Sequence, residues 1–172
     1  ANILGLNPFT DSTDQLIEKT RTTEMGKRGE FAYSNLGISL LGEALRRAAG
    51  ADSWKSYISE RLFTPLGMEH TTLTANQSEI PDGAIHGVQA NGRRGQSLSG
   101  TASNPAGAGV WSTPEDMTRY AQAVLTGTVP GGADPQEARW PAEVLAGFQL
   151  PGERIGYTWY TDVVDGHTII SH

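Results

Sequence analysis

The sequence predicts an α+β fold, in which a mainly helical lobe is followed by a C-terminal antiparallel β-hairpin. Before residue 150, apolar residues recur at spacings of three and four in several segments, which is the period of an amphipathic helix. Near the C-terminus the period changes to two, and Asp165-Gly166 separates two predicted strands, residues 155–164 and 167–172, as in a hairpin with a type I′ turn. We expect a single partial domain over residues 1–172, with the helical lobe over 1–150 and a hairpin of a truncated sheet over 151–172.

The first two predicted helices have clear end signals. The first begins at a cap, Asp11 or Ser12, and continues to about Met25, where glycines follow. The second covers residues 34–49, because leucine and alanine side chains follow the helical period there. Gly50 comes directly after it, at the position where a left-handed backbone conformation commonly ends a helix.

Three further helices are expected, and together the helices predict a core. A third helix follows an Asp52-Ser53 cap, and Pro114 opens a fourth that ends at Gly127. A short fifth is expected near residues 141–148. The side chains expected to be buried on the apolar faces are Leu36, Leu40, Ala44, Trp54, Ile58, Leu62, Leu66, Met117, Ala121 and Val124.

Two segments, residues 75–112 and 128–138, lack periodic hydrophobicity and are rich in residues that favour turns, so we expect long loops there. Long loops in compact domains usually have a function or are mobile. The first loop is therefore either a wall of a binding cleft or a solvated linker.

Composition excludes several classes of function. The chain has 13 Lys and Arg against 19 Asp and Glu, a net charge of −6, so a nucleic-acid partner is not expected. It contains no cysteine, and no apolar run is long enough to span a membrane. Its four histidines have no metal-ligand spacing, and no phosphate-binding loop is present. We therefore expect no metal and no cofactor.

Tyr33 and Asn35 stand two residues apart on the turn before the second helix. A phenol can relay a proton and an amide can orient a carbonyl group, so this pair suits acyl-transfer chemistry. The alternative is structural: Ser34 or Asn35 caps the helix while Tyr33 packs against it as a hydrophobic staple. The residues alone leave both interpretations open.

A larger set of motifs carries a resemblance. Residues 29–37 (Gly-Glu-Phe-Ala-Tyr-Ser-Asn-Leu-Gly), 41–43, 62–72 and 105–117 resemble the penicillin-recognising serine hydrolases. That family includes class C β-lactamase-like proteins, D-alanyl carboxypeptidases and family VIII-type esterases. The resemblance covers roughly residues 27–127 and implies a β-lactamase-like, or transpeptidase-like, fold.

The resemblance also implies roles for three residues. Tyr33 and Asn35 occupy the Tyr-x-Asn motif, which makes Tyr33 the proton relay and Asn35 the amide that orients the substrate. His172 resembles the first residue of the family's Lys/His-x-Gly motif, which binds substrate. His172 is alternatively an ordinary hairpin residue.

The nucleophile of that family, the serine of Ser-x-x-Lys, is absent from these 172 residues. The three lysines are preceded, three positions earlier, by Leu16, Glu24 and Asp52. By resemblance, the chain is expected to be the middle fragment of a serine hydrolase that forms an acyl-enzyme with a β-lactam, a D-alanyl peptide or a small ester. Without the motif it is predicted to be inactive alone. The alternative is a catalytically inactive penicillin-binding-protein-like module that binds cell-wall peptide or another ligand.

Expectations about partners follow from the same considerations. The partner is expected to be a small-molecule or peptide substrate, with no nucleic acid and no membrane span in this chain. The C-terminal hairpin, residues 155–172, would leave an exposed strand edge, which predicts either self-association through these residues or disorder there. By resemblance the location is extracytoplasmic.

Overall fold

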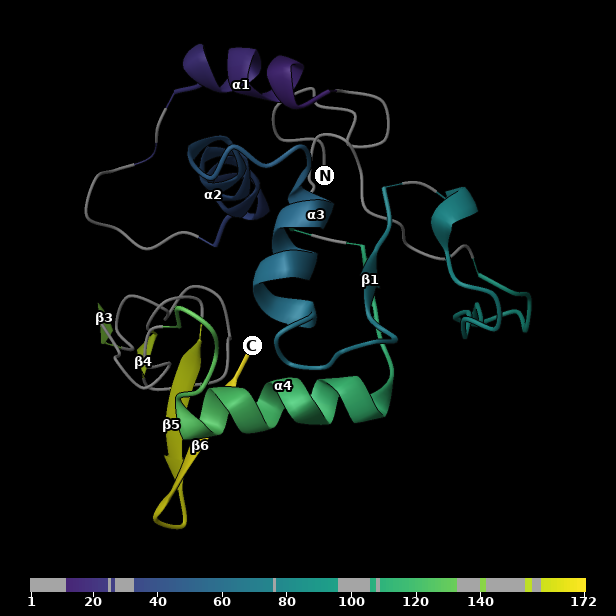
Figure 1. Cartoon of the computed structure of the whole chain (residues 1–172), viewed down its shortest axis with the longest axis vertical. Coiled ribbons are helices and arrows are strands. Elements are labelled where there is room, and N and C mark those ends of the chain that lie inside the picture. Colours follow the sequence, from purple (N-terminus) through teal and green to yellow (C-terminus); the bar gives the residue numbers. More distant parts are fainter. Residues whose placement is uncertain are drawn as a thin grey trace. The chain divides into compact units, whose positions relative to one another are not determined.

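The computed structural model describes the chain in two compact units. The first comprises residues 1–25 and 34–117, and the second comprises residues 26–33 and 118–172. Figure 1 follows the elements from the N- to the C-terminus and confirms an α+β fold. The residues described are 12–24, 26, 33–75, 77–95, 106–107, 109–132, 140–141, 154–155 and 159–172.

Helix α1 (Thr13–Arg21) begins as predicted but ends early. The Ser12 hydroxyl accepts from the backbone N–H of Gln15, whose side chain accepts from the Ser12 N–H in return, at 3.3 and 2.7 Å. This capping box fixes the first turn. The predicted end at Met25 is wrong, because three threonine hydroxyls within residues 20–23 donate to carbonyls of the last turn, which favours termination.

Helix α2 (Asn35–Ala48) confirms its predicted boundaries. Ser34 is the N-cap, and its hydroxyl accepts from the Gly37 N–H at 3.0 Å. Gly50 has a φ of +65°, so it takes the left-handed conformation expected after the C-cap. The cap assignment settles one alternative: Ser34, and not Asn35, caps the helix.

Helix α3 (Trp54–Ile58) continues into one turn of π-helix, Ser59–Phe63. Ser53 caps α3 in a capping box with Ser56, and Gly67, at a φ of +65°, follows the last turn. These ends agree with the predicted third helix. Phe63, the last residue of the π-helical turn, is buried.

Helices α2 and α3 meet through a small residue. The Cα of Gly42 lies so close to the Ala106 side chain that a Cβ on Gly42 would overlap it, and the Trp54 ring would lie 3.6 Å from that Cβ. Glycine is therefore required at residue 42 for α2 to approach both neighbours.

An ion-pair network centred on the buried Glu43 carboxylate joins α1 to α2. Arg46 makes a bidentate pair with this carboxylate, at 2.8 Å for each bond, and Arg47 donates at 2.5 Å. Arg47 also donates to Asp14 of α1, and Arg46 to the carbonyl of Ala51. The hydrogen bond from Arg46 lowers the pKa of Glu43 to about 2, aided by Arg47 and opposed by burial.

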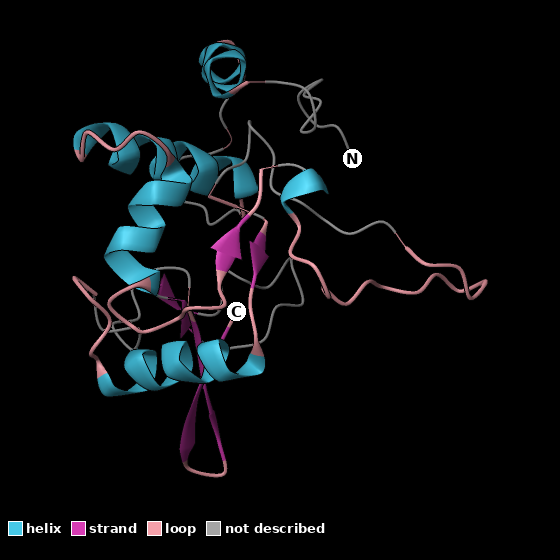
Figure 2. Ribbon diagram, turned by 45° about the vertical axis from the view of Figure 1, so that its right-hand side comes forward, coloured by secondary structure: helices cyan, strands magenta, loops and turns pink. Residues whose placement is uncertain are grey.

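Two short strands, missed by the sequence analysis, bound the first long loop. Strands β1 (Thr72–Leu73) and β2 (Val110–Trp111) pair antiparallel, as Figure 2 shows. Beyond this ladder, the backbone N–H of buried Thr74 donates to the Gly109 carbonyl at 2.8 Å. Strands of two residues have no periodicity, so pattern analysis does not detect them.

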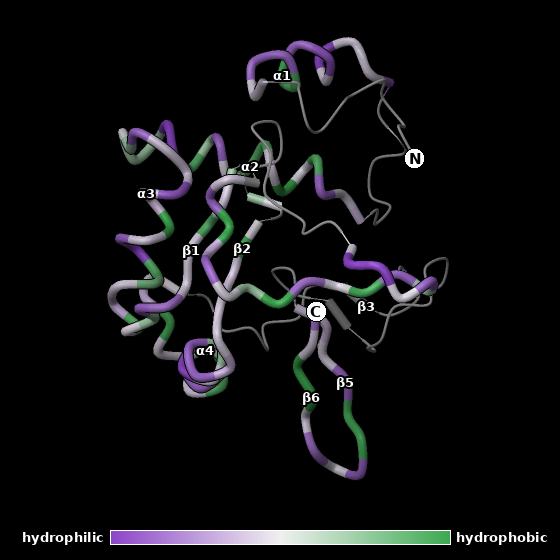
Figure 3. The backbone as a smooth tube through the Cα atoms, turned by 90° about the vertical axis from the view of Figure 1, so that its right-hand side faces the viewer, coloured by the Kyte–Doolittle hydropathy of each residue, from purple (hydrophilic) through white to green (hydrophobic). Residues whose placement is uncertain are grey.

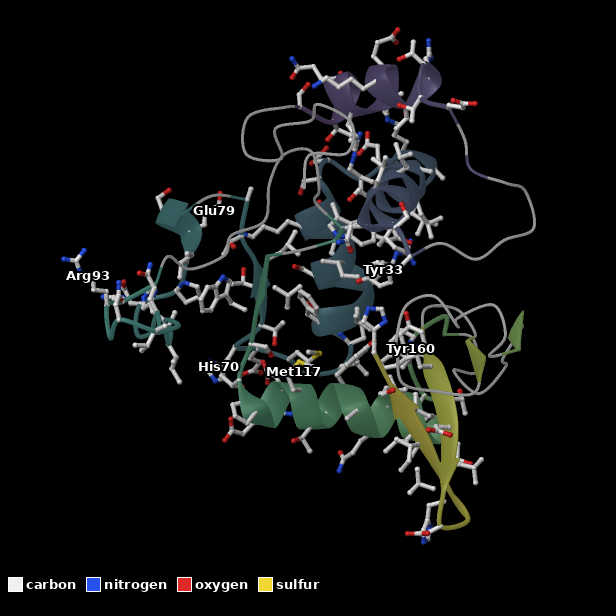
Figure 4. All side chains as sticks on the ribbon, turned by 180° about the vertical axis from the view of Figure 1, so that it is seen from behind. Tyr33, His70, Glu79, Arg93, Met117 and Tyr160 are labelled. Carbon is white, nitrogen blue, oxygen red and sulfur yellow. The ribbon has the colours of Figure 1, made fainter. Side chains whose placement is uncertain are left out.

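Helix α4 (Pro114–Thr126) agrees with its predicted boundaries, and its first turn holds the residues after α3 in place. The Asp116 side chain is fully buried and accepts from the His70 N–H and from the Thr71 hydroxyl, each at 2.8 Å. Thr71 also shares a hydrogen bond of 2.7 Å with the Ser112 hydroxyl. Figure 4 shows His70 beside the N-terminal end of α4.

The second unit contains a four-stranded antiparallel sheet in the order β3-β4-β5-β6. Its strands are β3 (Trp140–Pro141), β4 (Arg154–Ile155), β5 (Tyr160–Val164) and β6 (His167–Ser171). The predicted β5–β6 hairpin is confirmed, because Asp165 and Gly166 have φ values of 50° and 78°, as a type I′ turn requires. Figure 3 shows hydrophobic stretches on both arms of this hairpin.

The single strand predicted over residues 155–164 is wrong, because Ile155 belongs to β4 and pairs antiparallel with Tyr160, the first residue of β5. Of the short helix expected near residues 141–148, only Pro141 is described, and it belongs to β3; the rest lies outside the described residues.

The predicted core is only partly correct. Val124 is buried, but Ala44, Met117 and Ala121 are exposed, so their assignment to the core is wrong. The remaining six are half-buried: Leu36, Leu40, Trp54, Ile58, Leu62 and Leu66. The physical reason is that α2 buries its small and paired polar residues Ser39, Gly42 and Glu43. The helical period predicts an apolar stripe, but it does not say which face other residues cover.

Candidate active site

The turn that precedes α2 presents the two residues of the Tyr-x-Asn motif. Tyr33 is 44% exposed, and Asn35 is an exposed residue in the first turn of α2. Because the Ser34 hydroxyl already caps the helix, the Asn35 amide is not needed for that purpose. The side chain in the middle of the motif is thus structural, and the two that flank it lie at the surface.

Tyr33 lies in the second unit together with His172 and Tyr160. The rings of Tyr33 and His172 have centroids 6.2 Å apart, and those of Tyr160 and His172 are 5.8 Å apart, both tilted. Figure 4 labels the two tyrosines. We call these three side chains the aromatic cluster. It joins one loop residue to the two arms of the C-terminal hairpin, so two of the three predicted site residues come together.

Burial distinguishes the members of the aromatic cluster. Tyr160 is only 2% exposed, whereas Tyr33 and His172 are exposed. Burial raises the pKa of Tyr160, and the nearby Tyr33 phenol raises it further, since two phenolates would repel. Tyr160 therefore keeps its proton over a wide range of pH. The third predicted site residue, Asn35, belongs to the first unit, two positions along the chain from Tyr33.

Tyr160 is the member of this cluster that the sequence analysis missed. A signal for it was available, because a two-residue turn at Asp165-Gly166 fixes the register of the hairpin. That register pairs Tyr160 with Ser171, the residue before His172. Counting back from the turn would have placed Tyr160 next to the predicted substrate-binding residue.

Among the residues that the structure describes, no three His, Asp or Glu side chains lie close enough together to hold a metal ion. No helix among the same residues has both the length and the hydrophobicity needed to cross a membrane.

Known proteins resemble this chain over part of their length. The D-alanyl-D-alanine-carboxypeptidase/endopeptidase AmpH of Escherichia coli K12 is 36% identical over 97 residues, which cover 56% of this chain and 24% of that protein. A D-stereospecific amidohydrolase from Streptomyces superimposes with a TM-score of 0.72 at 18% identity, over 95% of this chain and 49% of that one. The beta-lactamase/D-alanine carboxypeptidase of Yersinia pestis, complexed with citrate, has a TM-score of 0.63 at 25% identity, over 91% of this chain and 46% of that one.

These likenesses bear on the fold and on the family. The chain spans about a quarter of the length of AmpH and about half the length of the two solved structures. The structural likeness confirms the β-lactamase-like fold expected from the motifs. A family model described as Beta-lactamase matches residues 4–172, so the chain belongs to the beta-lactamase family of penicillin-recognising serine hydrolases.

Proposed function

We propose that this chain forms part of a serine hydrolase that acts through an acyl-enzyme on a β-lactam, a D-alanyl peptide or a small ester. The observation that carries the proposal is the approach of Tyr33 and His172, whose ring centroids are 6.2 Å apart. These residues are 139 positions apart in the sequence, the difference between 172 and 33. Their approach is what a shared substrate site would require.

Each residue has a role that suits its chemistry. The exposed Tyr33 phenol relays the proton that leaves the attacking hydroxyl and returns it to the leaving group. The Asn35 amide orients the carbonyl of the substrate, and His172 contacts the substrate beside Tyr33. In these roles Tyr33 and Asn35 are catalytic residues and His172 binds substrate.

The nucleophile is the part of this mechanism that the 172 residues lack, because they contain no Ser-x-x-Lys. Removing the nucleophile of such a site costs on the order of a millionfold in rate, so we expect no turnover by residues 1–172 alone. A second candidate function is that of a catalytically inactive module that binds cell-wall peptide or another ligand.

Labelling with a fluorescent penicillin and a fluorophosphonate separates the two candidates. The full-length gene product that carries residues 1–172 is incubated with each reagent, and intact mass spectrometry detects the adduct. A hydrolase gains the mass of one acyl or phosphonyl group and turns over nitrocefin, a p-nitrophenyl ester or a D-alanyl peptide. Ligand binding without an adduct would instead support the inactive module.

The isolated chain of 172 residues provides the complementary test. It is expected to form no adduct and to hydrolyse none of these substrates. Turnover above background that disappears in Tyr33→Phe would mean that a residue of this chain attacks the substrate, and the assignment of the nucleophile to a Ser-x-x-Lys motif would be wrong.

We also propose that the protein acts outside the cytoplasm and that two copies associate through residues 155–172. Strand β6 is an end strand of its sheet, and Ile169 on it is 45% exposed. Unpaired backbone groups at such an edge favour pairing with a second strand. Analytical ultracentrifugation is expected to detect a dimer that Ile169→Lys weakens and that Leu125→Lys, at an exposed position on α4, leaves intact. Cell fractionation tests the location.

A further inference from the structure

The segment between Asp82 and Glu115 contains no acidic residue, although the whole chain has a net charge of −6. Its lysine and arginine content is the adjacent pair Arg93 and Arg94, and both side chains are exposed. Neither guanidinium forms an ion pair with a carboxylate of the described residues. The pair is therefore a local positive charge that suits a partner of opposite charge.

The same segment exposes two large apolar side chains. Ile85 is 91% exposed and Val88 is 73% exposed, the two highest values among the large hydrophobic residues that the structure describes. Contact of such side chains with water is unfavourable, and neighbouring cases commonly mark an interaction site. We call residues 83–95, which contain both the apolar side chains and the arginines, the basic loop.

The basic loop has a defined local structure within the first unit. Val88 and Arg94 form an antiparallel bridge, and the Gln89 N–H donates to the Arg93 carbonyl at 2.8 Å. Residues that pair in this way have their side chains on one face, so Val88 and Arg94 are presented together. Figures 1 and 2 show the loop extending away from β1, and in Figure 4 Arg93 lies at its outer end.

The β5–β6 hairpin is a useful comparison, because its turn also follows exposed apolar residues. Val163 and Val164 are 57% and 51% exposed, but the charged residues beside them are Asp162 and Asp165. An anionic surface would repel this hairpin and attract the basic loop. Of these two turns, only the basic loop combines apolar exposure with positive charge.

We propose that the basic loop binds the surface of an anionic phospholipid bilayer. Ile85 and Val88 enter the boundary between headgroups and acyl chains, while Arg93 and Arg94 pair with lipid phosphates. The apolar side chains favour a bilayer over a soluble polyanion, which offers no apolar phase. With two apolar and two cationic side chains the contact is weak and reversible. This role goes beyond the proposed hydrolase function and does not depend on it.

Co-sedimentation with vesicles tests the assignment. The full-length gene product is mixed at low ionic strength with vesicles of phosphatidylcholine and phosphatidylglycerol, and with vesicles of phosphatidylcholine alone. It is expected to bind the anionic vesicles more tightly and to be released by added salt, which screens the arginines. Arg93→Gln and Arg94→Gln should each lower the partition coefficient about 5-fold. Ile85→Ser combined with Val88→Ser should lower it by at least about 10-fold.

Two variants outside the basic loop are matched controls. Arg61→Gln removes an exposed arginine and so changes the net charge equally, and Leu125→Ser removes an apolar side chain that is 64% exposed on α4. Neither should change vesicle binding. Thermal unfolding checks that every variant folds, and the loop variants should keep the wild-type Tm because the substituted side chains are exposed.

Two results would overturn the proposal. One is no binding to the anionic vesicles, or binding that the controls lower as much as the loop variants do. The other is binding that requires the arginines, is unchanged by the Ile85 and Val88 substitutions and is competed by soluble polyphosphate, because that would indicate a polyanion site instead of a lipid surface. Penicillin labelling of the same variants measures the hydrolase separately, so a failure of vesicle binding leaves the proposed function untouched.

Discussion

Asp116 and Tyr160 are both buried polar residues, and their surroundings differ. The Asp116 carboxylate accepts hydrogen bonds from a backbone N–H and a hydroxyl, and the hydroxyl has a further partner in Ser112. The Tyr160 hydroxyl has no hydrogen-bond partner within the described residues. The Tyr160 ring belongs to the aromatic cluster with the exposed rings of Tyr33 and His172. Asp116 lies in residues 105–117, one of the segments that carry the family resemblance, and Tyr160 lies in none of those segments.

This difference indicates that the two buried polar residues contribute to the protein in different ways. A satisfied polar network fixes how one element docks on another, so the residues around Asp116 preserve the fold. A cluster with an unsatisfied hydroxyl is costly for stability and is retained where a site requires it. The motif residues that bond to Asp116, His70 and Thr71, therefore have a structural part in the fold.

The largest expected effect tests the aromatic cluster. Tyr33→Phe in the full-length gene product is expected to lower kcat about 100- to 10,000-fold, because positioned proton transfer contributes that much to a rate. Steady-state hydrolysis of the preferred substrate measures it.

The matched control is Tyr57→Phe. Tyr57 stacks on Trp54 in the first unit, with ring centroids 5.4 Å apart. Equal losses of kcat in Tyr33→Phe and Tyr57→Phe would mean that removing a tyrosine hydroxyl disturbs the fold in general. The contrast between the aromatic cluster and the rest of the molecule would then disappear.

Removing the Asp116 carboxylate is expected to lower the stability of the protein. Asp116→Ala removes the acceptor of the His70 N–H and of the Thr71 hydroxyl, which should lower the free energy of unfolding by about 3 kcal/mol. Urea denaturation measures this change. Glu115→Ala, at the exposed neighbouring position, should change it by less than about 0.5 kcal/mol.

The Glu43 network predicts how stability depends on pH. Folding lowers the pKa of Glu43 from its ordinary value of 4.5 to about 2. The contribution of the Glu43 carboxylate to folding stability is therefore complete above pH 4.5 and is lost as the pH falls toward 2. Glu43→Gln should lower stability at pH 7 on the order of 2 kcal/mol, below the value for fully buried pairs because Arg47 is half exposed. Its unfolding curves at pH 3 and 7 should differ less than those of the wild type.

The smallest expected effect compares two glycines of α2. Gly42→Ala should destabilise the protein by about 1–2 kcal/mol, because the new Cβ overlaps Ala106. Gly37→Ala should stabilise it by up to about 1 kcal/mol, since its Cβ meets only Ser34 atoms at 3.4 and 3.5 Å. Melting temperatures that shift in the same direction would contradict the close packing around residue 42.

The accuracy of the sequence predictions follows the range of the interactions involved. Ser34, Gly50 and Asp165-Gly166 act on their own backbone, and each marked an element boundary correctly. Packing depends on distant residues. The exposure of Ala44 and the burial of Glu43 on α2 follow from the ion pairs of Glu43 and the contact of Gly42 with Ala106, which no helical period encodes.

The same distinction applies to the candidate site. The Tyr-x-Asn motif and the terminal histidine were predicted from a resemblance, and their catalytic roles stay predictions. The proximity of Tyr33 to His172 required the fold of the second unit. The position of Tyr160 beside Ser171 could have been predicted from the hairpin register, but its burial and its unpaired hydroxyl depend on tertiary packing.

The segment from Gly87 to Gly95, within the first long loop, closes on itself through its own backbone hydrogen bonds. Val88 bridges Arg94, and Gly95 donates from its backbone N–H to the Gly87 carbonyl at 2.7 Å. Because its bonds are local, residues can be inserted or deleted at its tip without disturbing the pairing of β1 and β2. A change in the length of this tip should therefore alter the surface of the protein there at little cost in stability.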